Sequence, residues 1–258
     1  MKSKISIVLI VLAFGLSLAA IPSEIWAQAN NNHNQKIERS VEKRLQDQQL
    51  TKGNEIAIAV EGKTVVLTGT VSDIHQMNEV EKQTGKAARG YIIVNNLAVT
   101  QANLTDQQLR DNVEKQIQKN VFYSIYDWVE FDVNNGEVKL AGWVRESWNK
   151  RQFEHAIQKV PGVIKLDDQI QIESQSIFDD EVRNQAANLI YNDPYFVPSY
   201  TGSGAPIHII VNDGNVYLEG QVSRADMRDW AENTVYMNTK AFQVFDDLKV
   251  QNDRAEKN

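Results

Sequence analysis

The chain has 258 residues, of which 42% are hydrophobic and 24% are charged, and its formal net charge is -7. A single hydrophobic core rarely grows past about 250 residues, so this length allows one to three domains. The sequence contains no cysteine, which excludes disulfide bonds, a thiol nucleophile and cysteine-ligated metal centres. The negative charge argues against broad nucleic-acid binding, because that affinity depends on neutralising phosphates.

The first 29 residues are predicted to be a secretory signal peptide. Two lysines within the first four residues precede an apolar run over 5–21, and Ala27-Gln28-Ala29 supplies the small-residue pattern of a cleavage site. An uncleaved membrane anchor is the alternative, because the apolar run is almost long enough to span a bilayer. We expect cleavage near Ala29, which leaves a net charge of -8. The mature protein is then expected in the periplasm, with secretion as the second possibility.

The rest of the chain repeats one pattern three times. Aligned without gaps on Gly69, Gly142 and Gly220, the segments read EIAIAVEGKTVVLTGTV, WVEFDVNNGEVKLAGWV and PIHIIVNDGNVYLEGQV. Apolar residues recur at the same positions before each glycine and again at 28 and 30 positions after it. The spacings of 73 and 78 residues are too long for a solenoid repeat. We therefore predict three copies of a small domain, over 35–100, 104–173 and 178–251.

Each copy is predicted to fold in the order αββαβ. Apolar residues at helical spacing, such as Leu109, Val113 and Ile117, indicate an amphipathic first helix. Two alternating strands follow, joined at 61–63, 134–136 or 212–214 by residues that tolerate the positive φ of a hairpin turn. A second helix and a last strand complete the copy. The predicted fold class is α+β, with three tandem two-layer sandwiches, each a three-stranded sheet covered by two helices.

The three aligned glycines are predicted to be structural. Gly142 lies in the middle of the apolar strand face that Leu140 and Val144 share. A glycine there indicates close backbone approach or a bulge, most simply where a helix crosses the strand. A phosphate-binding glycine would instead need a glycine-rich loop that opens a helix, and the surrounding residues do not form one.

These features resemble the BON domain, in the αββαβ order, the Asn/Asp-Gly turn, the V-x-L-x-G-x-V strand and the segment 160–163, Val-Pro-Gly-Val. The resemblance covers nearly all of residues 35–251 and is most specific in the second copy. The first copy has Arg89-Gly90-Tyr91 in place of Pro-Gly-Val, and the third has Met237-Asn238 there and a longer loop before its first strand.

BON domains occur in exported osmotic-stress-induced and division-site lipoproteins of bacteria, and in some channel and nodulation-related proteins. What the resemblance implies is a non-catalytic module that contacts phospholipid surfaces or envelope proteins. The family has no catalytic residues to carry over to this chain.

No motif in the sequence favours catalysis or metal binding. The four histidines have no partners at i, i+4 spacing, and neither an HExxH nor a G-x-S-x-G motif is present. His208 is expected on the surface. The pairs Asp167-Asp168 and Asp246-Asp247 recur at one position before the last strand, which favours a polar turn over acid–base chemistry. We predict no enzyme activity, no metal site and no cofactor.

The second helix of copy two carries one candidate contact surface. On a helical wheel, its core stripe leaves Trp148, Arg151, His155 and Lys159 together on the opposite side. A large aromatic side chain among cations is typical of anchoring at a lipid interface. The alternative is a solvated helix face whose Trp148 packs against a neighbouring copy.

The loop between the first helix and the first strand is the other candidate. It is rich in aromatic residues in copies two and three, namely Phe122, Tyr123, Tyr126, Tyr195, Phe196 and Tyr200. Exposed aromatic residues suggest contact with a membrane or a protein. The alternative is packing between copies, because Trp128 and Trp143 are predicted on the outward face of the sheet.

The leading functional hypothesis is a cell-envelope protein that binds phospholipid headgroups peripherally, with copy two as the contact module. The alternative is a periplasmic chaperone or protein-interaction scaffold in envelope stress that uses the aromatic loops. The sequence indicates neither the lipid or protein that is bound nor the oligomeric state.

Overall fold

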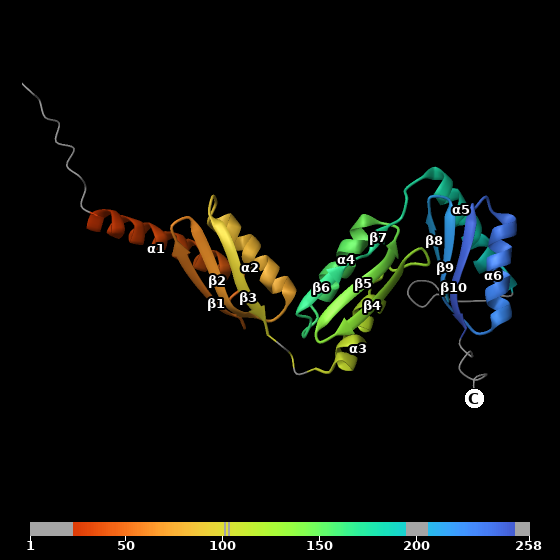
Figure 1. The fold of residues 1–258 in the computed structure, drawn as a ribbon, viewed down its shortest axis with the longest axis horizontal. Helices are drawn as coiled ribbons and strands as arrows, with labels where there is room; N and C mark the ends of the chain where they lie inside the picture. The colour runs from red at the N-terminus through yellow and green to blue at the C-terminus, as the bar shows by residue number, and fades with distance from the viewer. Residues whose placement is uncertain (1–22, 101, 103, 195–205, 251–258) are drawn as a thin grey trace, which may run out of the picture.

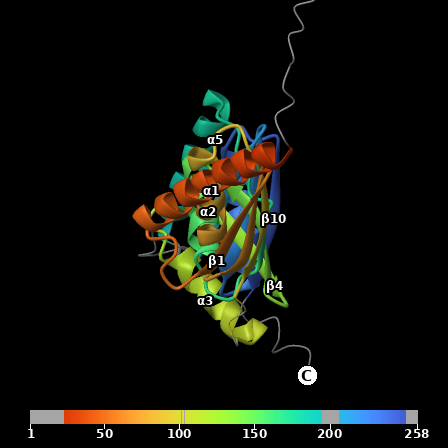
Figure 2. The same ribbon diagram turned by 90° about the vertical axis from the view of Figure 1, so that its left-hand side faces the viewer.

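The computed structural model of the chain describes residues 23–100, 102, 104–194 and 206–250. Within them, three similar units follow one another in a row (Figure 1). We call them domain 1 (α1 to β3), domain 2 (α3 to β7) and domain 3 (α5 to β10). Figure 2 views this row from the domain 1 end, with α1 nearest the reader.

The elements of each domain follow the predicted order. In domain 1 they are α1 (Ser23–Asp47), β1 (Glu55–Glu61), β2 (Thr64–Val71), α2 (Ile74–Ala87) and β3 (Ile92–Val99). In domain 2 they are α3 (Asp106–Gln118), β4 (Trp128–Asn134), β5 (Glu137–Val144), α4 (Ser147–Gln158), β6 (Lys165–Asp168) and β7 (Gln171–Ile172). In domain 3 they are α5 (Ile177–Tyr191), β8 (Ile207–Asn212), β9 (Asn215–Val222), α6 (Ala225–Asn238) and β10 (Gln243–Val250). The α+β fold of three tandem sandwiches is confirmed.

The strand order is the same in all three sheets, with the second strand of each domain in the centre. The first and second strands are antiparallel, and the second and last strands are parallel. The hairpin turns of domains 2 and 3 have positive φ at both central residues, Asn135-Gly136 and Asp213-Gly214, as a type I′ turn requires. In domain 2 the last strand is interrupted, so β6 and β7 both pair with β5.

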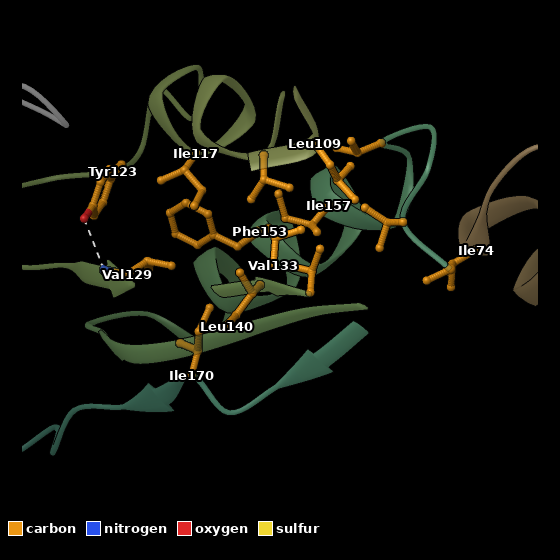
Figure 3. Packing of buried hydrophobic residues seen from close by; sticks show 14 of the residues in the cluster. Ile74, Leu109, Ile117, Tyr123, Val129, Val133, Leu140, Phe153, Ile157 and Ile170 are labelled. Atoms are coloured by element: carbon orange, nitrogen blue, oxygen red, sulfur yellow. Dashed lines mark hydrogen bonds between the residues drawn. The ribbon is translucent and has the colours of Figure 1, made fainter. Parts of the chain in front are cut away.

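Each domain has a hydrophobic core of its own. In domain 2, Phe153 and Ile157 of α4 pack between α3 and the sheet, where they meet Ile117 and Leu140 (Figure 3). The three cores still touch at the domain joints. Ile74, the first residue of α2, belongs to the core cluster of domain 2, while Tyr126 of domain 2 packs against the core of domain 3.

The three aligned glycines are structural, but a crossing helix is not the reason. Each has a positive φ of 110° to 121°. A Cβ atom at Gly142 would lie 2.1 Å from the carbonyl oxygen of Trp128 on the neighbouring antiparallel strand. The corresponding distances are 1.9 Å at Gly69 and 2.3 Å at Gly220. The predicted close approach is therefore between two strands, and the strand pairing runs through all three glycines without a bulge.

The recurrent acidic pairs lie within the last strands and not in turns, so that prediction was wrong. The Asp168 and Asp246 carboxylates accept hydrogen bonds from the backbone N–H two residues on, at 3.0 Å in both cases. Asp168 also lies 3.7 Å from Lys150 Nζ, and Asp246 lies 3.2 Å from Arg228 Nε. These carboxylates fix the last strand to the second helix of their domain.

Candidate functional site

An exposed apolar cluster lies at one end of domain 2. We call it the domain 2 tip and define it by Val121, Phe122 and Trp148. These side chains have exposed fractions of 85%, 53% and 39%. The rings of Phe122 and Trp148 meet edge to face, with centroids 4.9 Å apart. A mutual ring contact of this kind holds both aromatic side chains in place while they remain in contact with solvent.

Two asparagines build the turn that displays the tip. The buried side-chain amide of Asn149, in the first turn of α4, donates to the Phe122 carbonyl at 3.3 Å and accepts from Asn120 Nδ2 at 2.8 Å. The Phe122 N–H donates to Asn120 Oδ1 at 3.0 Å. The sequence patterns did not single out Val121, Asn120 or Asn149. An Asn two residues after the end of a helix, followed by two apolar residues, was the available signal.

Two cations border the tip. Arg151 lies three residues after Trp148 and therefore on the same face of α4, and Lys119 immediately precedes the turn. Both are exposed, and neither forms an ion pair with any residue that the structure describes. The tip thus combines apolar side chains with unpaired positive charge.

The other two residues of the predicted α4 face lie at the joint with domain 1. The ring of His155 meets that of His75 in α2, with centroids 4.8 Å apart. Burial lowers the pKa of His75, and the nearby charges of Lys159 and His155 lower it further, against the opposing effect of Asp73 and Glu79. The structure therefore divides the predicted face, with Trp148 and Arg151 at the tip and His155 and Lys159 at the joint.

Tyr123, a candidate contact residue, is buried. Its hydroxyl accepts a hydrogen bond from the Val129 N–H at 3.1 Å (Figure 3), and its ring meets the edge of Phe153 at 5.5 Å. Burial raises the pKa of the Tyr123 hydroxyl above its usual range. Tyr123 cannot meet a membrane or an external partner in this arrangement.

The rest of the aromatic loop docks on domain 3. The Ile125 carbonyl accepts from the Ile209 N–H at 2.7 Å, and Tyr126 is half-buried against the domain 3 core. Trp128 lies opposite Trp143 in the sheet, and its ring centroid is 5.1 Å from that of His208. The alternative that these aromatic residues pack between copies holds for Tyr126 and Trp128.

His208 is 1% exposed, so its expected place on the surface was wrong. It does point away from the core of domain 3, but the loop of domain 2 covers that face of the sheet. Its Nδ1 contacts the Ser124 carbonyl oxygen at 3.1 Å, and its ring stacks on Tyr123 at 5.3 Å. A pattern read within one domain could not reveal that a second domain covers the strand.

A buried ion pair also joins domains 2 and 3. Arg183 of α5 lies 2.6 Å from Glu173, which follows β7, and both side chains are almost fully buried. The same Glu173 oxygen accepts from the Val211 N–H at 3.2 Å. Burial raises the pKa of Glu173 to about 7, although Arg183 opposes this shift. No pattern in the sequence singled out this pair.

The remaining candidates give no further site. Tyr195, Phe196 and Tyr200 lie outside the described residues. Over the described ranges, no group of three or more acidic, histidine or cysteine side chains is placed to hold a metal ion. No helix in that same part of the chain has the length and apolar character needed to cross a membrane.

Comparison with known proteins identifies one family. The BON domain family model matches residues 33–101, 105–174 and 198–236. No curated protein matches the chain.

Two solved structures resemble the chain at low similarity. One is that of CdsD, a structural protein of the type III secretion system of Chlamydia trachomatis, and the other is that of the CdsD C-terminal domain. Their sequences are 11% and 12% identical to the chain. The alignments cover 82% of this chain and 90% and 96% of those chains, with TM-scores of 0.23. This likeness is too low to inform fold or function.

Proposed function

Because the chain belongs to the BON domain family, with three such domains in tandem, we propose that it is a non-catalytic cell-envelope protein that binds phospholipid surfaces peripherally. Domain 2 is the contact module. The observation that carries the proposal is the domain 2 tip, where Phe122 and Trp148 are exposed and in mutual contact beside Arg151. A signal peptide cleaved near Ala29 places the protein in the periplasm.

The chemistry of the tip suits the boundary between headgroups and acyl chains. Trp148 and Phe122 are large enough to reach below the headgroups, and Val121 adds apolar area beside them. Arg151 and Lys119 remain at the level of the phosphates, where each cation contributes about 1 kcal/mol on an anionic surface. The net charge of the whole chain, -7, opposes this attraction weakly, because salt screens charges more than about 8 Å away.

Liposome flotation of the mature chain tests this proposal. We expect binding to vesicles that contain anionic lipid and weaker binding to purely zwitterionic vesicles. Trp148→Ala and Phe122→Ala should each lower the bound fraction about tenfold, since burial of an aromatic side chain contributes about 1.5–3 kcal/mol. Arg151→Glu should abolish the preference for anionic lipid.

Trp230→Ala is the matched control, because Trp230 is an exposed tryptophan on the second helix of domain 3. This variant should bind as the wild type does. Absence of binding, or binding that survives the loss of both tip aromatics, contradicts the proposal.

The structure weakens the alternative of a chaperone or scaffold that uses the aromatic loops. Tyr123 of that loop is buried and Tyr126 is half-buried against the domain 3 core, so Tyr123 is not available to a client protein and Tyr126 is available only in part. Suppression of client aggregation without lipid binding would favour that alternative over the lipid contact.

A further inference from the structure

Two histidine side chains from different domains face each other at the joint between domains 1 and 2. His75 lies in the first turn of α2, and His155 lies in the last turn of α4. Their ring centroids are 4.8 Å apart, and the ring planes are inclined at 68°. The sequence contains no pair of histidines at helical spacing, and this pair escapes such a search because its members belong to two copies of the repeat.

The contact that brings the two histidines together is anchored in both domains. Figure 1 shows α2 and α4 facing each other across the joint. Ile74, directly before His75, belongs to the core cluster of domain 2 (Figure 3). Met77, two residues after His75, packs against the cores of both domains. His75 is therefore held against α4 while its ring remains half-buried and that of His155 remains exposed.

The ring nitrogens of both histidines are available to a ligand. Neither ring has a hydrogen-bond partner among the residues that the structure describes. By contrast, His33 contacts the Tyr91 hydroxyl and His208 contacts a backbone carbonyl. The rings of His75 and His155 can therefore turn about their Cβ–Cγ bonds without breaking a hydrogen bond to this part of the chain. Neutral imidazole nitrogens are good ligands for Zn²⁺, Cu²⁺ and Ni²⁺.

The separation of the rings suits two ligands of one metal ion. Zinc–nitrogen bonds in proteins are about 2.0–2.1 Å long. Two imidazoles bound at this length, with a ligand angle between about 90° and about 109°, have their ring centroids about 4.5–5.2 Å apart. The observed separation of 4.8 Å lies within that range. The described ranges hold no group of three or more such ligands, so water molecules would complete the coordination.

Charges of both signs surround the pair. The carboxylates of Asp73 and Glu79 act on His75 and favour a bound cation, whereas the nearby Lys159 opposes one. Each carboxylate already accepts hydrogen bonds from residues of α2, so it acts on an ion through its charge and not as a ligand. Because Lys159 would attract an anion, the effect of removing this lysine distinguishes a bound cation from a bound anion.

We propose that His75 and His155 together bind one divalent transition-metal ion, represented by Zn²⁺, across the joint between domains 1 and 2. Each domain supplies one ligand, so the bound ion fixes α2 against α4. The site goes beyond lipid binding and does not depend on it, because the proposed lipid contact uses Trp148, Phe122 and the cations beside them.

Isothermal titration calorimetry of the mature chain with Zn²⁺ tests the proposal. The wild type should bind one ion per chain. His75→Gln and His155→Gln should each weaken binding at least about tenfold, because even the loss of a residue that only supports a metal ligand costs about 10- to 100-fold in affinity. Lys159→Gln should strengthen binding about twofold to fivefold, since it removes a nearby charge of the same sign as the ion.

His33→Gln is the control, because His33 is an exposed histidine of α1 outside the joint, and this variant should bind Zn²⁺ as the wild type does. Nitrogen NMR spectra of the histidine side chains should show the rings of His75 and His155 shifting together as Zn²⁺ is added. Absence of binding, binding that survives either substitution at the joint, or loss of binding in His33→Gln overturns the proposal. Weaker Zn²⁺ binding in Lys159→Gln also overturns it, because a cation site is not strengthened by a neighbouring lysine.

Discussion

At the scale of single residues, the missing Cβ atom of three glycines determines how closely the first two strands of each domain approach. The carbonyl oxygen fourteen residues earlier occupies the position that the side chain would need, within 1.9 Å to 2.3 Å. The periodicity of the sequence predicted that these glycines matter. It could not identify the clashing atom, because that depends on how the two strands pair.

Gly69→Ala should therefore destabilise domain 1 by about 3 kcal/mol or more, since it combines a backbone clash with a positive φ of 121°. Hydrogen exchange of the β1 and β2 amides measures the loss. Gly85→Ala in α2 of the same domain is the control, because a Cβ atom there has no neighbour within 4 Å. It should raise stability by about 0.5–1 kcal/mol. Equal effects of the two substitutions would contradict this explanation.

At the scale of elements, an aspartate in the first turn of the first helix holds the hairpin turn in domains 2 and 3. Asp106 of α3 accepts hydrogen bonds from the Asn135 and Gly136 N–H groups. Asp179 of α5 accepts from Asp213 and Gly214. In domain 1 the contact is different, because Asn34 lies in the middle of α1 and donates to the Val60 carbonyl within β1. Helical and strand periodicity predicted the elements and their order. The hydrogen bonds from the turns to the helices could not be predicted. The loops between helix and strand differ in length, so no fixed sequence spacing relates the helix residue to the turn.

Asp179→Ala should lower the stability of domain 3 by about 2 kcal/mol, because it leaves the buried Gly214 N–H and the neighbouring Asp213 N–H without their acceptor. Differential scanning calorimetry of the domain 3 transition measures the change. Glu181→Ala is a control in the same helix. Its exposed ion pair with Lys240 should contribute under about 0.5 kcal/mol. A similar, small effect of both substitutions would show that the hydrogen bonds from Asp213 and Gly214 to Asp179 contribute little to the stability of domain 3.

At the scale of the whole molecule, the two joints between domains are built differently. Domains 1 and 2 meet through α2 and α4, with His75 against His155. Domains 2 and 3 meet through a loop, a sheet face and the Glu173–Arg183 pair. The predicted α+β fold in three tandem copies is confirmed, and it was predictable because each copy repeats one pattern. The expected surface position of His208 was wrong because its surroundings come from a neighbouring domain, which no local pattern encodes. Tyr123 is instead buried in the core of its own domain, against Val129 and Phe153.

The joint between domains 1 and 2 should loosen in acid. The pKa of His75 lies below its usual value of 6.5, so neutral His75 stabilises the joint above that pH, and the stabilisation is lost as the pH falls through the lowered pKa. Protonation then places positive charge beside His155 and Lys159. The carboxylates of Asp73 and Glu79 oppose this effect only in part.

Small-angle X-ray scattering should show a larger radius of gyration when the pH falls from about 7.5 to about 5.5. The double variant His75→Gln/His155→Gln should suppress this expansion. His33→Gln, on the exposed face of α1, is the control and should preserve it. An unchanged radius in the wild type contradicts the expected loosening.

The position of Glu173 determines where a recombinant fragment that contains domain 3 alone should begin. This residue follows the last strand of domain 2, yet its carboxylate lies beside Arg183 and the Val211 N–H of domain 3. A recombinant domain 3 that starts at residue 178 would lose Glu173 and leave the buried Arg183 guanidinium with Asp180, which is partly exposed, as its remaining described ion-pair partner. We therefore expect a domain 3 fragment that begins at or before Glu173 to be more stable than one that begins at residue 178.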